Sequence, residues 1–385
     1  MSVALEQIAR LGSDIEIEEV TTSAGLTALE PLWDALVTQA RFTHPFVTHL
    51  WMRTFWSAFG SSSRLMVLVV RRAGRAIAIA PLARRTRTML GMSYRVIETI
   101  RNPHSPRSDL IFTDHPSDAA RAILEYLVLR DVEWDMLELA HLPVASTALT
   151  KMQRAARHLS LRTGLRDLGG SPHIVLPSRW DTLQRTIPAR YRSSLRNRKR
   201  RLARIGSVRL ESVTAPSAAD FDDFFRLETS AWKRDAGTAI ASDAATSQFY
   251  RALAVRASER GWLRLQFLAV GERRIAASYT LLYDNRIHVL KSGYDPDFAV
   301  YSPGNLLCEL ALEQAIEEGR REYDFLGDAD PWKLAWTSVV RPHRWLSVFP
   351  DSFRGRWLHR AKFGALARLR PGGAPGPAPH PPEAS

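Results

Sequence analysis

The sequence predicts an α/β fold built from two copies of one strand-and-helix unit. In the clearer copy, three apolar runs bounded by turn formers are followed by a helical pattern and by a short fourth run at residues 323–326. This order is typical of three strands, a helix and a strand. A similar order occurs between residues 64 and 137, so the sequence predicts a tandem α/β architecture. The three runs of the clearer copy are residues 263–270, 275–283 and 287–294.

The helix of this unit begins at a corner, residues 301–305, that follows the third strand. Ser302 is a favourable N-cap, and Pro303 is favoured at the first helical position. The free N–H groups of such a helix start converge on one point, which suits a phosphate, and Gly304 would let a diphosphate approach the backbone. The alternative is an ordinary capped helix. The apolar helical positions are Leu306, Leu307, Leu310, Ala311 and Ile316, and Gly319 ends the pattern.

The first copy shows the same order in matching segments. Residues 64–70 echo residues 264–270, and residues 133–137 echo residues 322–326. No glycine opens the helix of the first copy, and a polar loop at residues 102–107 stands in place of the Ser-Pro-Gly corner. We therefore expect the first copy to be a scaffold or a substrate-side lobe. The polar loop either lines a cleft between the copies or faces solvent.

The chain divides into four predicted parts. Residues 1–172 form an N-terminal lobe, and residues 173–350 form a C-terminal lobe that a strand at 343–349 closes. Residues 351–370 have the pattern of a basic amphipathic helix, which either touches an anionic membrane surface or, as we expect, packs on the fold. Residues 371–385 are rich in Pro, Gly and Ala, and we expect them to be disordered.

Residues 190–204 are the most highly charged stretch of the sequence. Arg and Lys side chains this dense repel one another unless an anion lies near them. The functional interpretation is a site for the phosphates of a substrate, a lipid headgroup or RNA. The structural interpretation is a solvated linker helix that pairs with acidic residues. The basic residues are Arg190, Arg192, Arg196, Arg198, Lys199, Arg200, Arg201 and Arg204.

The chain has 53 basic and 40 acidic residues, a formal net charge of +13, which favours an anionic partner. No apolar run approaches the roughly 20 residues of a membrane-spanning helix, and the acidic N-terminus differs from a secretory signal, so we expect a cytoplasmic protein. Cys308 is the only cysteine, and the histidines lack metal-ligand spacing. We therefore expect no metal site. The phosphate-loop, nucleophile-elbow and dinucleotide-binding motifs do not occur.

Four motifs follow one another in the second copy: Glu228-x-x-x-Trp232-Lys233, Tyr301-Ser302-Pro303-Gly304, Asp324-Phe325-Leu326-Gly327 and Trp332-Lys333-x-x-Trp336. Together they resemble the GNAT superfamily of acyltransferases, in particular its CelD/BcsL type from cellulose and exopolysaccharide synthesis, which is related to FemAB-like transferases. The resemblance implies tandem GNAT-like lobes, each a mixed, mostly antiparallel sheet flanked by helices. It also implies that two strands of the C-terminal lobe splay apart. Acyl-CoA would lie between them as a co-substrate, with no tightly bound cofactor.

The resemblance implies roles for individual residues. Asp324, acting through a water, or Glu228 would be the base, and Tyr294 or Tyr301 would return a proton to the departing thiolate. Alternatives stay open, because Asp324 would otherwise fix the turn at Gly327 and Glu228 would be an ordinary surface acid. The donor would bind at Lys291, Ser292, Gly293, Ser302, Pro303, Gly304 and Asn305, and the acceptor at Trp232, Lys233, Trp332 and Lys333.

Three functions follow as hypotheses. The first is an acetyl-CoA-dependent N- or O-acetyltransferase that acts on a sugar or polysaccharide precursor. The second is a FemAB-like transferase that uses aminoacyl-tRNA, which the basic stretch at 190–204 suits. The third is a non-catalytic accessory protein of exopolysaccharide synthesis, in which the single glycine of the corner marks a decayed donor site. No DNA partner is expected.

Overall fold

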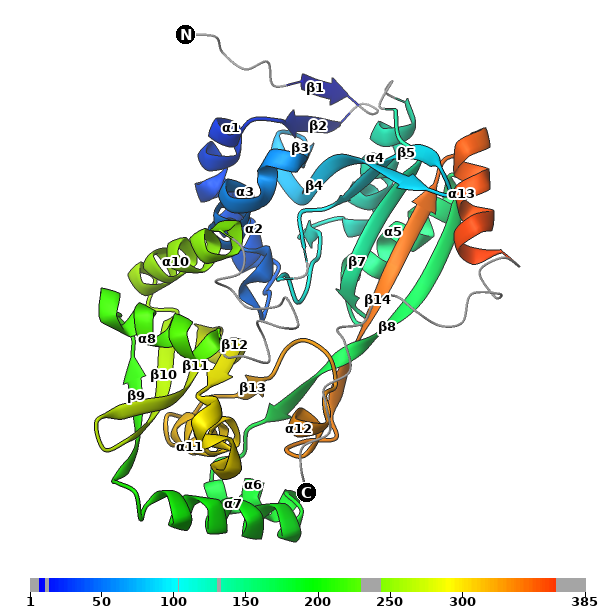
Figure 1. Cartoon of the computed structure of the whole chain (residues 1–385). Helices are drawn as coiled ribbons and strands as arrows, with labels where there is room; N and C mark the ends of the chain where they lie inside the picture. Colours follow the sequence, from blue (N-terminus) through cyan, green and yellow to red (C-terminus); the bar gives the residue numbers. More distant parts are fainter. Residues whose placement is uncertain (1–6, 11–13, 103, 130–132, 230–243, 365–385) are drawn as a thin grey trace.

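The computed structural model describes residues 7–10, 14–102, 104–129, 133–229 and 244–364 (Figure 1). The predicted acceptor residues Trp232 and Lys233 and the tail at 371–385 lie outside these ranges. The strands join in one mixed sheet with the order β1-β2-β3-β4-β5-β7-β14-β8-β13-β12-β11-β10-β9, and β6 pairs with β4.

The first half of the chain follows the predicted order. Strands β2 to β5 form an antiparallel meander, and α4 then crosses to β7, which pairs with β5 in parallel. The strands are β1 (Gln7–Arg10), β2 (Ile15–Val20), β3 (Arg64–Arg72), β4 (Arg75–Met89), β5 (Met92–Thr99), β6 (Ile111–Phe112) and β7 (Met136–Pro143). The helices are α1 (Ser23–Ala28), α2 (Glu30–Gln39), α3 (His49–Phe59), α4 (Pro116–Leu129) and α5 (Thr147–His158), with 3₁₀ turns η1 (Pro45–Val47) and η2 (Gly60–Ser62).

The second half repeats this topology. Strands β9 to β12 are antiparallel, and α11 crosses to β13, which pairs with β12 in parallel. The predicted tandem α/β fold is therefore confirmed. The elements are α6 (Trp180–Thr186), α7 (Ala189–Leu202), β9 (Val208–Val213), α8 (Ala218–Glu228), α10 (Ala244–Glu259), β10 (Leu263–Val270), β11 (Arg273–Tyr283), β12 (Arg286–Tyr294), η4 (Pro296–Tyr301), α11 (Pro303–Glu317), β13 (Glu322–Asp324) and α12 (Pro331–Leu334).

Two long strands join the halves, β8 (Arg162–Val175) and β14 (Val340–Phe349). The strand predicted at 343–349 exists, but it lies between β7 and β8 in the first half's sheet rather than closing the second half. It cannot pair with β13 on that side, because the last residues of β8 already do so. Figure 1 shows both strands running diagonally across the molecule.

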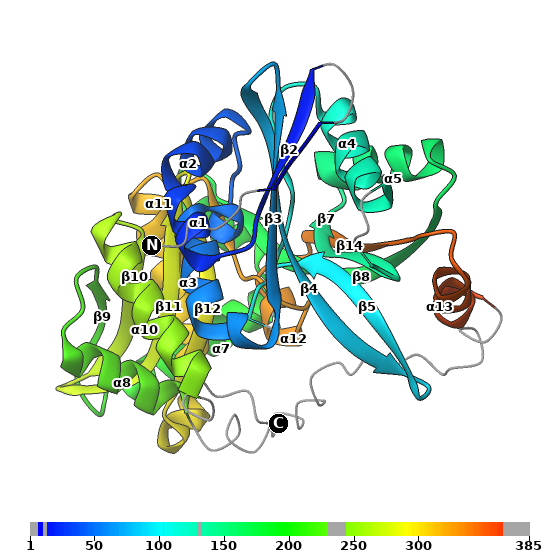
Figure 2. The same cartoon turned by 90° about the horizontal axis from the view of Figure 1, so that it is seen from above.

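Apolar packing also crosses between the halves. Trp51 and Phe55 lie four residues apart, on one face of α3, and both are buried. Their partner is Phe249 of α10, whose ring centre lies 5.2 Å from that of Trp51. The view from above shows α10 beside α1 and α3 (Figure 2). The relative position of the two halves is therefore set by a shared core as well as by the sheet.

The last described helix, α13 (Phe353–Phe363), packs on the first half's sheet. Leu358 is fully buried, and the ring of Phe363 lies so close to Gly164 that a Cβ at that glycine would overlap it. The expected packing of this helix is confirmed. Among the described residues, no helix is both long enough and apolar enough to cross a bilayer.

Candidate active site

Strands β12 and β13 part after a short parallel contact. They pair only at Arg286 with Glu322, Ile287 with Tyr323 and His288 with Asp324. Beyond that point β12 continues to Tyr294 with β11 as its neighbour, and its register shifts by one residue between the partners of Tyr279 and Thr280. An extra residue of this kind bends a strand and ends its pairing. Because β13 ends at Asp324, the last residues of β12 have no strand partner on that side, as the predicted splay requires.

The start of α11 lies beside this splay, with a geometry that differs in one detail from the prediction. Ser302 occupies the N-cap position in a left-handed conformation, φ 48° and ψ 58°, and its side chain makes no capping hydrogen bond. Its carbonyl accepts from the N–H groups of Asn305 and Leu306. Its hydroxyl oxygen instead accepts a hydrogen bond from Arg198 of α7. A cation therefore stands at the positive end of α11, which favours an anion there.

Gly304 leaves open space in the first turn of this helix. A Cβ built on Gly304 would meet one heavy atom within 4 Å, Cδ1 of Tyr294, at 3.8 Å. The glycine is therefore not required by the packing of the protein, and a bound group can approach the backbone at this point. This geometry fits the diphosphate of an acyl-CoA.

In the first half, the segment that contains Ser108 connects the equivalent strands, β5 and β7, through hydrogen bonds. The N–H of Ser108 donates to the carbonyl of His141 at 3.3 Å, and its hydroxyl donates to the carbonyl of Ala140. The same hydroxyl contacts Thr99, the last residue of β5, at 3.2 Å. The segment that follows β5 thus turns back onto the edge of β7. This arrangement supports the interpretation of the first half as a scaffold or substrate-side lobe.

Asp324, predicted as a base, is a fully buried carboxylate between two guanidinium groups. Arg107 and Arg341 both donate to it, the latter at 2.7 Å. Burial alone would raise the pKa of Asp324, but the charge of Arg107, the neighbouring His288 and the charge of Arg341 hold that pKa well below its usual range. Its Oδ1 also accepts from the N–H of Leu326 at 3.0 Å. So weak a base suits the structural alternative, in which Asp324 fixes the following turn.

Arg107 connects the two halves at this point. It comes from the polar loop of the first half, is buried, and donates to Ser171 of β8 at 2.7 Å as well as to Asp324. Arg341 of β14 extends the network to Glu322 at 2.8 Å. The sequence interpretation missed both arginines, because Arg107 and Asp324 lie 217 residues apart.

A second group of polar side chains lies on the opposite, α8 side of β12. Glu228 ends α8 and is fully buried, and Nζ of Lys291 lies 5.9 Å from the ring centre of Tyr250 of α10. Burial lowers the pKa of Lys291 while the charge of Glu228 opposes that shift, and burial together with Glu228 raises the pKa of Tyr250. The structure thus brings Glu228 and Lys291 together, so Glu228 is not a surface acid.

Gly293 explains how α8 comes so near to β12. A Cβ at Gly293 would lie 2.4 Å from the carbonyl oxygen of Leu227 and 2.5 Å from Cα of Glu228. Only a residue without a side chain permits this approach of a helix end to the strand. Gly293 therefore positions Glu228, in addition to any part its backbone plays toward a donor.

The remaining predicted residues are distributed around the end of β13 and the α11 corner. Nζ of Lys333 donates to the carbonyls of Leu326 and Asp328 and forms an ion pair with Asp330 at 2.8 Å. These contacts satisfy the ammonium group, which disfavours the predicted binding of an acceptor anion. The ring of Trp332 packs edge-on against Phe325.

The two candidate proton donors flank the corner. Tyr294, at the end of β12, is the side chain nearest to Gly304. Tyr301 lies beneath the guanidinium of Arg201, whose Cζ is 5.4 Å from the ring centre. Both positions are close to where the corner would hold a donor.

The basic helix α7 lies against this corner and lacks acidic partners. None of its seven cations forms an ion pair with another described residue, although Glu309 of α11 lies within electrostatic reach of Lys199 and Arg196. By contrast, Arg274 of β11 pairs with three carboxylates. The described residues therefore do not show the acidic partners that the structural interpretation of this helix requires.

Comparisons with known proteins agree with this geometry. Residues 189–334 match the family described as "Acetyltransferase (GNAT) domain". A search of curated proteins found no match. The fold is similar to the crystal structure of FemX, with a TM-score of 0.57, 13% identity and coverage of 86% of this chain and 97% of that chain.

Two further solved structures have a similar fold. A conserved protein of unknown function from Bacteroides thetaiotaomicron has a TM-score of 0.54 and 10% identity, covering 90% of this chain and 100% of that one. A tandem GNAT protein from the clavulanic acid biosynthesis pathway has a TM-score of 0.50 and 15% identity, covering 87% and 99%. Residues 189–334 are thus similar to a GNAT acetyltransferase domain, and the fold of the chain is similar to that of a tandem GNAT protein.

Proposed function

We propose that this protein is an acyl-CoA-dependent N- or O-acyltransferase of the CelD/BcsL type. It moves an acetyl or other short acyl group to an amino or hydroxyl group of a sugar or polysaccharide precursor. The proposal rests on one observation: β12 continues past the end of β13 beside a helix start that is open at Gly304 and carries Arg198. The match of residues 189–334 to a GNAT domain supports it. We further propose a cytoplasmic protein whose lobes divide near residue 173, with β14 returning to the sheet of the first lobe.

The proposed roles follow the geometry. The N–H groups at the start of α11 and Arg198 hold the diphosphate of the donor, and the unpaired edge of β12 holds its arm and polarises the thioester carbonyl. Glu228, buried beside Lys291, accepts the proton of the acceptor nucleophile. Tyr294, next to Gly304, returns a proton to the thiolate of CoA. Asp324 positions β13 through its two arginines rather than acting as the base.

Replacing Arg198 with alanine is expected to weaken acetyl-CoA binding about tenfold, since one charge-assisted contact to a phosphate is lost. Arg200→Ala is the matched control, because Arg200 lies on the same helix, is exposed, and makes no contact with Ser302. Isothermal titration with acetyl-CoA measures both variants. Equal weakening by both would indicate general attraction by the basic helix, and no weakening by Arg198→Ala would remove this residue from the donor site.

The uncompensated charge of α7 favours a second candidate, a FemAB-like transferase that uses aminoacyl-tRNA. A titration with uncharged tRNA over a range of salt concentrations distinguishes the two. A polyanion held by several cations loses affinity steeply with salt, with a log–log slope near the number of phosphates contacted. Tight tRNA binding with a steep slope, together with undetectable acetyl-CoA binding, would favour the tRNA-dependent reaction.

A further inference from the structure

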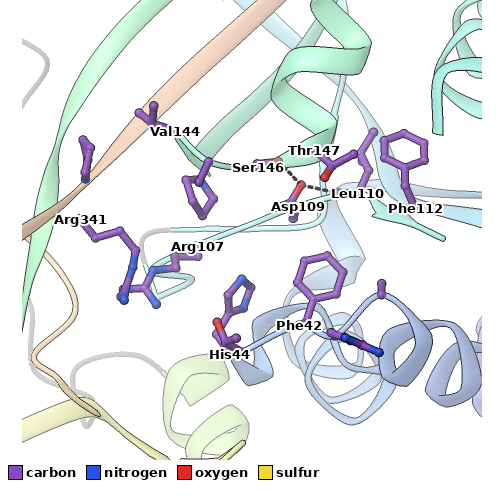
Figure 3. A pocket seen from close by; sticks show the side chains of 16 residues that line it. Phe42, His44, Arg107, Asp109, Leu110, Phe112, Val144, Ser146, Thr147 and Arg341 are labelled. Carbon is purple, nitrogen blue, oxygen red and sulfur yellow. Dashed lines mark hydrogen bonds between the residues drawn. The ribbon is translucent and has the colours of Figure 1, made fainter. Parts of the chain in front are cut away.

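A pocket of about 520 Å³ opens on the first-half side of the Arg107–Asp324 network (Figure 3). Its walls come from the chain between α2 and η1, the segment leading into β6, the β7–α5 connection, and β14. This volume falls within the usual range of small-molecule sites. Arg107 and Arg341 stand together at one end. Because these two arginines also hold Asp324, the pocket adjoins β13, the strand that borders the splay.

The charged groups in the walls favour an anion. Arg107 and Arg341 are balanced by Asp324 and Glu322. Arg41, however, is exposed and forms no ion pair with any described residue. The first turn of α5 also lines the pocket through Thr147, and its N-terminus adds partial positive charge.

A buried, unpartnered nitrogen points to a bound molecule. His44 is 5% exposed, and its Nδ1 has no hydrogen-bond partner among the described residues. Burial first, and then the charges of Arg107 and His288, lower the pKa of His44 well below its usual value, so its ring is neutral. A buried polar atom without a partner is costly, and a ligand in this pocket would satisfy it.

The carboxyl of Asp109 also lies in the wall without a cationic partner. It accepts hydrogen bonds from Ser146 at 2.7 Å and from the N–H of Leu110 at 2.9 Å. Burial raises the pKa of Asp109 to about 7, against the opposing effect of these two hydrogen bonds. Near neutral pH it is protonated about half of the time, and in that form it offers an O–H to a ligand. Apolar walls at Phe42, Leu110 and Val144 would contact the body of a ring.

We infer that this pocket binds the anionic group of the acyl acceptor, a carboxylate or a phosphate monoester on a sugar-sized ring. This inference rests on the proposed function, because it names the class of acceptor for that transferase. The acid group would lie toward Arg41 and the first turn of α5, with His44 donating to the ring. The rest of the acceptor would extend past Arg107 toward β13.

Three probes test the inference by isothermal titration: glucuronate, glucose 6-phosphate and neutral glucose, each with and without acetyl-CoA. We expect both anions to bind, glucose to bind at least tenfold more weakly, and acetyl-CoA not to compete. Arg41→Ala should weaken anion binding about tenfold. Arg154→Ala, which removes an exposed cation of α5 that does not line the pocket, is the control. The tighter of the two anions identifies the acid group.

Binding of glucuronate, which stays ionised over this range, should depend on pH through Asp109. An anion favours the protonated carboxyl, so affinity should fall about tenfold between pH 6 and pH 8 if only the protonated form binds. The groups that face Asp109 are Ser146 and the N–H of Leu110, and the other charged or titratable groups of the walls are Arg41, His44, Arg107 and Arg341. Asp109→Asn should remove the pH dependence.

Glucose binding as tightly as the anions, or anion binding that Arg41→Ala leaves unchanged, would overturn the inference. So would the absence of binding by either anion at millimolar concentration. In each case acetyl-CoA binding to the same preparation shows whether the donor site is intact. Its loss would instead contradict the proposed function, so the two failures are distinguishable.

Discussion

Replacing Asp324 with asparagine is expected to lower the free energy of unfolding by about 3–5 kcal/mol, the usual cost of breaking a buried ion pair. The reason is the environment of Arg107, which is 2% exposed and would keep its charge after losing its counterion. Arg341 would lose one of its two carboxylate partners as well. Because the polar loop at Arg107 meets β8, β13 and β14 in this network, the loss weakens the contact between the two halves.

Urea unfolding of the wild type and of Asp324→Asn measures the effect, with Asp328→Asn as the control, since Asp328 is exposed on the same loop. The pH dependence gives a second readout. The folded-state pKa of Asp324 lies below its unfolded value. Its ion pairs therefore stabilise the protein above about pH 4, and this stabilisation is lost as the pH falls. The difference between wild type and variant should be largest above pH 5 and shrink toward pH 2.

The same variant separates the two roles of Asp324. If Asp324 served only as the catalytic base and its ion pairs did not stabilise the fold, Asp324→Asn would unfold like the wild type at every pH and would lose only turnover. An unchanged free energy of unfolding would therefore contradict the structural role derived from its contacts with Arg107 and Arg341.

Replacing Gly304 with aspartate is expected to abolish acetyl-CoA binding, with a loss of at least about a hundredfold, while the protein stays folded. The Cβ meets only Tyr294, at an ordinary contact distance of 3.8 Å, so the packing does not change. A carboxylate in the first turn of a helix is stabilising by about 0.3–1 kcal/mol. The same charge repels a diphosphate and occupies its place. Stability and binding should thus change in opposite directions.

Isothermal titration and thermal unfolding of Gly304→Asp and Gly304→Ala test this. The alanine variant adds no negative charge to the start of α11, so it should bind acetyl-CoA much more tightly than the aspartate variant. A lower melting temperature for Gly304→Asp would mean that the corner has a packing role. If Gly304→Asp bound acetyl-CoA as tightly as the wild type, the acyl donor would have to bind at another site.

The order of strands and helices could be predicted from sequence because each element carries its own signal. The apolar runs of β10, β11 and β12, the corner at Ser302 and Pro303, and the echo of these runs in the first half are all local patterns. The duplication then followed from comparing short segments. The pairing of β14 with β7 and β8 in the first half's sheet has no such local signal in the sequence, because it depends on which sheet edge is free.

The site was harder to predict for the same reason. Glu228 and Gly304 belong to local motifs, and the structure places each of them beside a residue of β12, Gly293 and Tyr294 respectively. The contacts of Asp324 with Arg107 and of Lys333 with the carbonyl groups of a turn form only when the chain folds. These contacts favour a structural role for both residues. The pocket at Asp109 is lined by four separate segments of the chain, so no single sequence motif predicts it.

The most direct measurement is a crystal structure of the protein grown with CoA. The account predicts density for the diphosphate within hydrogen-bond distance of the N–H groups at Gly304 and Asn305 and of the guanidinium of Arg198. The pantetheine arm should run along the unpaired edge of β12. Density for CoA at another surface, or a first turn of α11 left without ligand at saturating CoA, would contradict the assignment of the donor site.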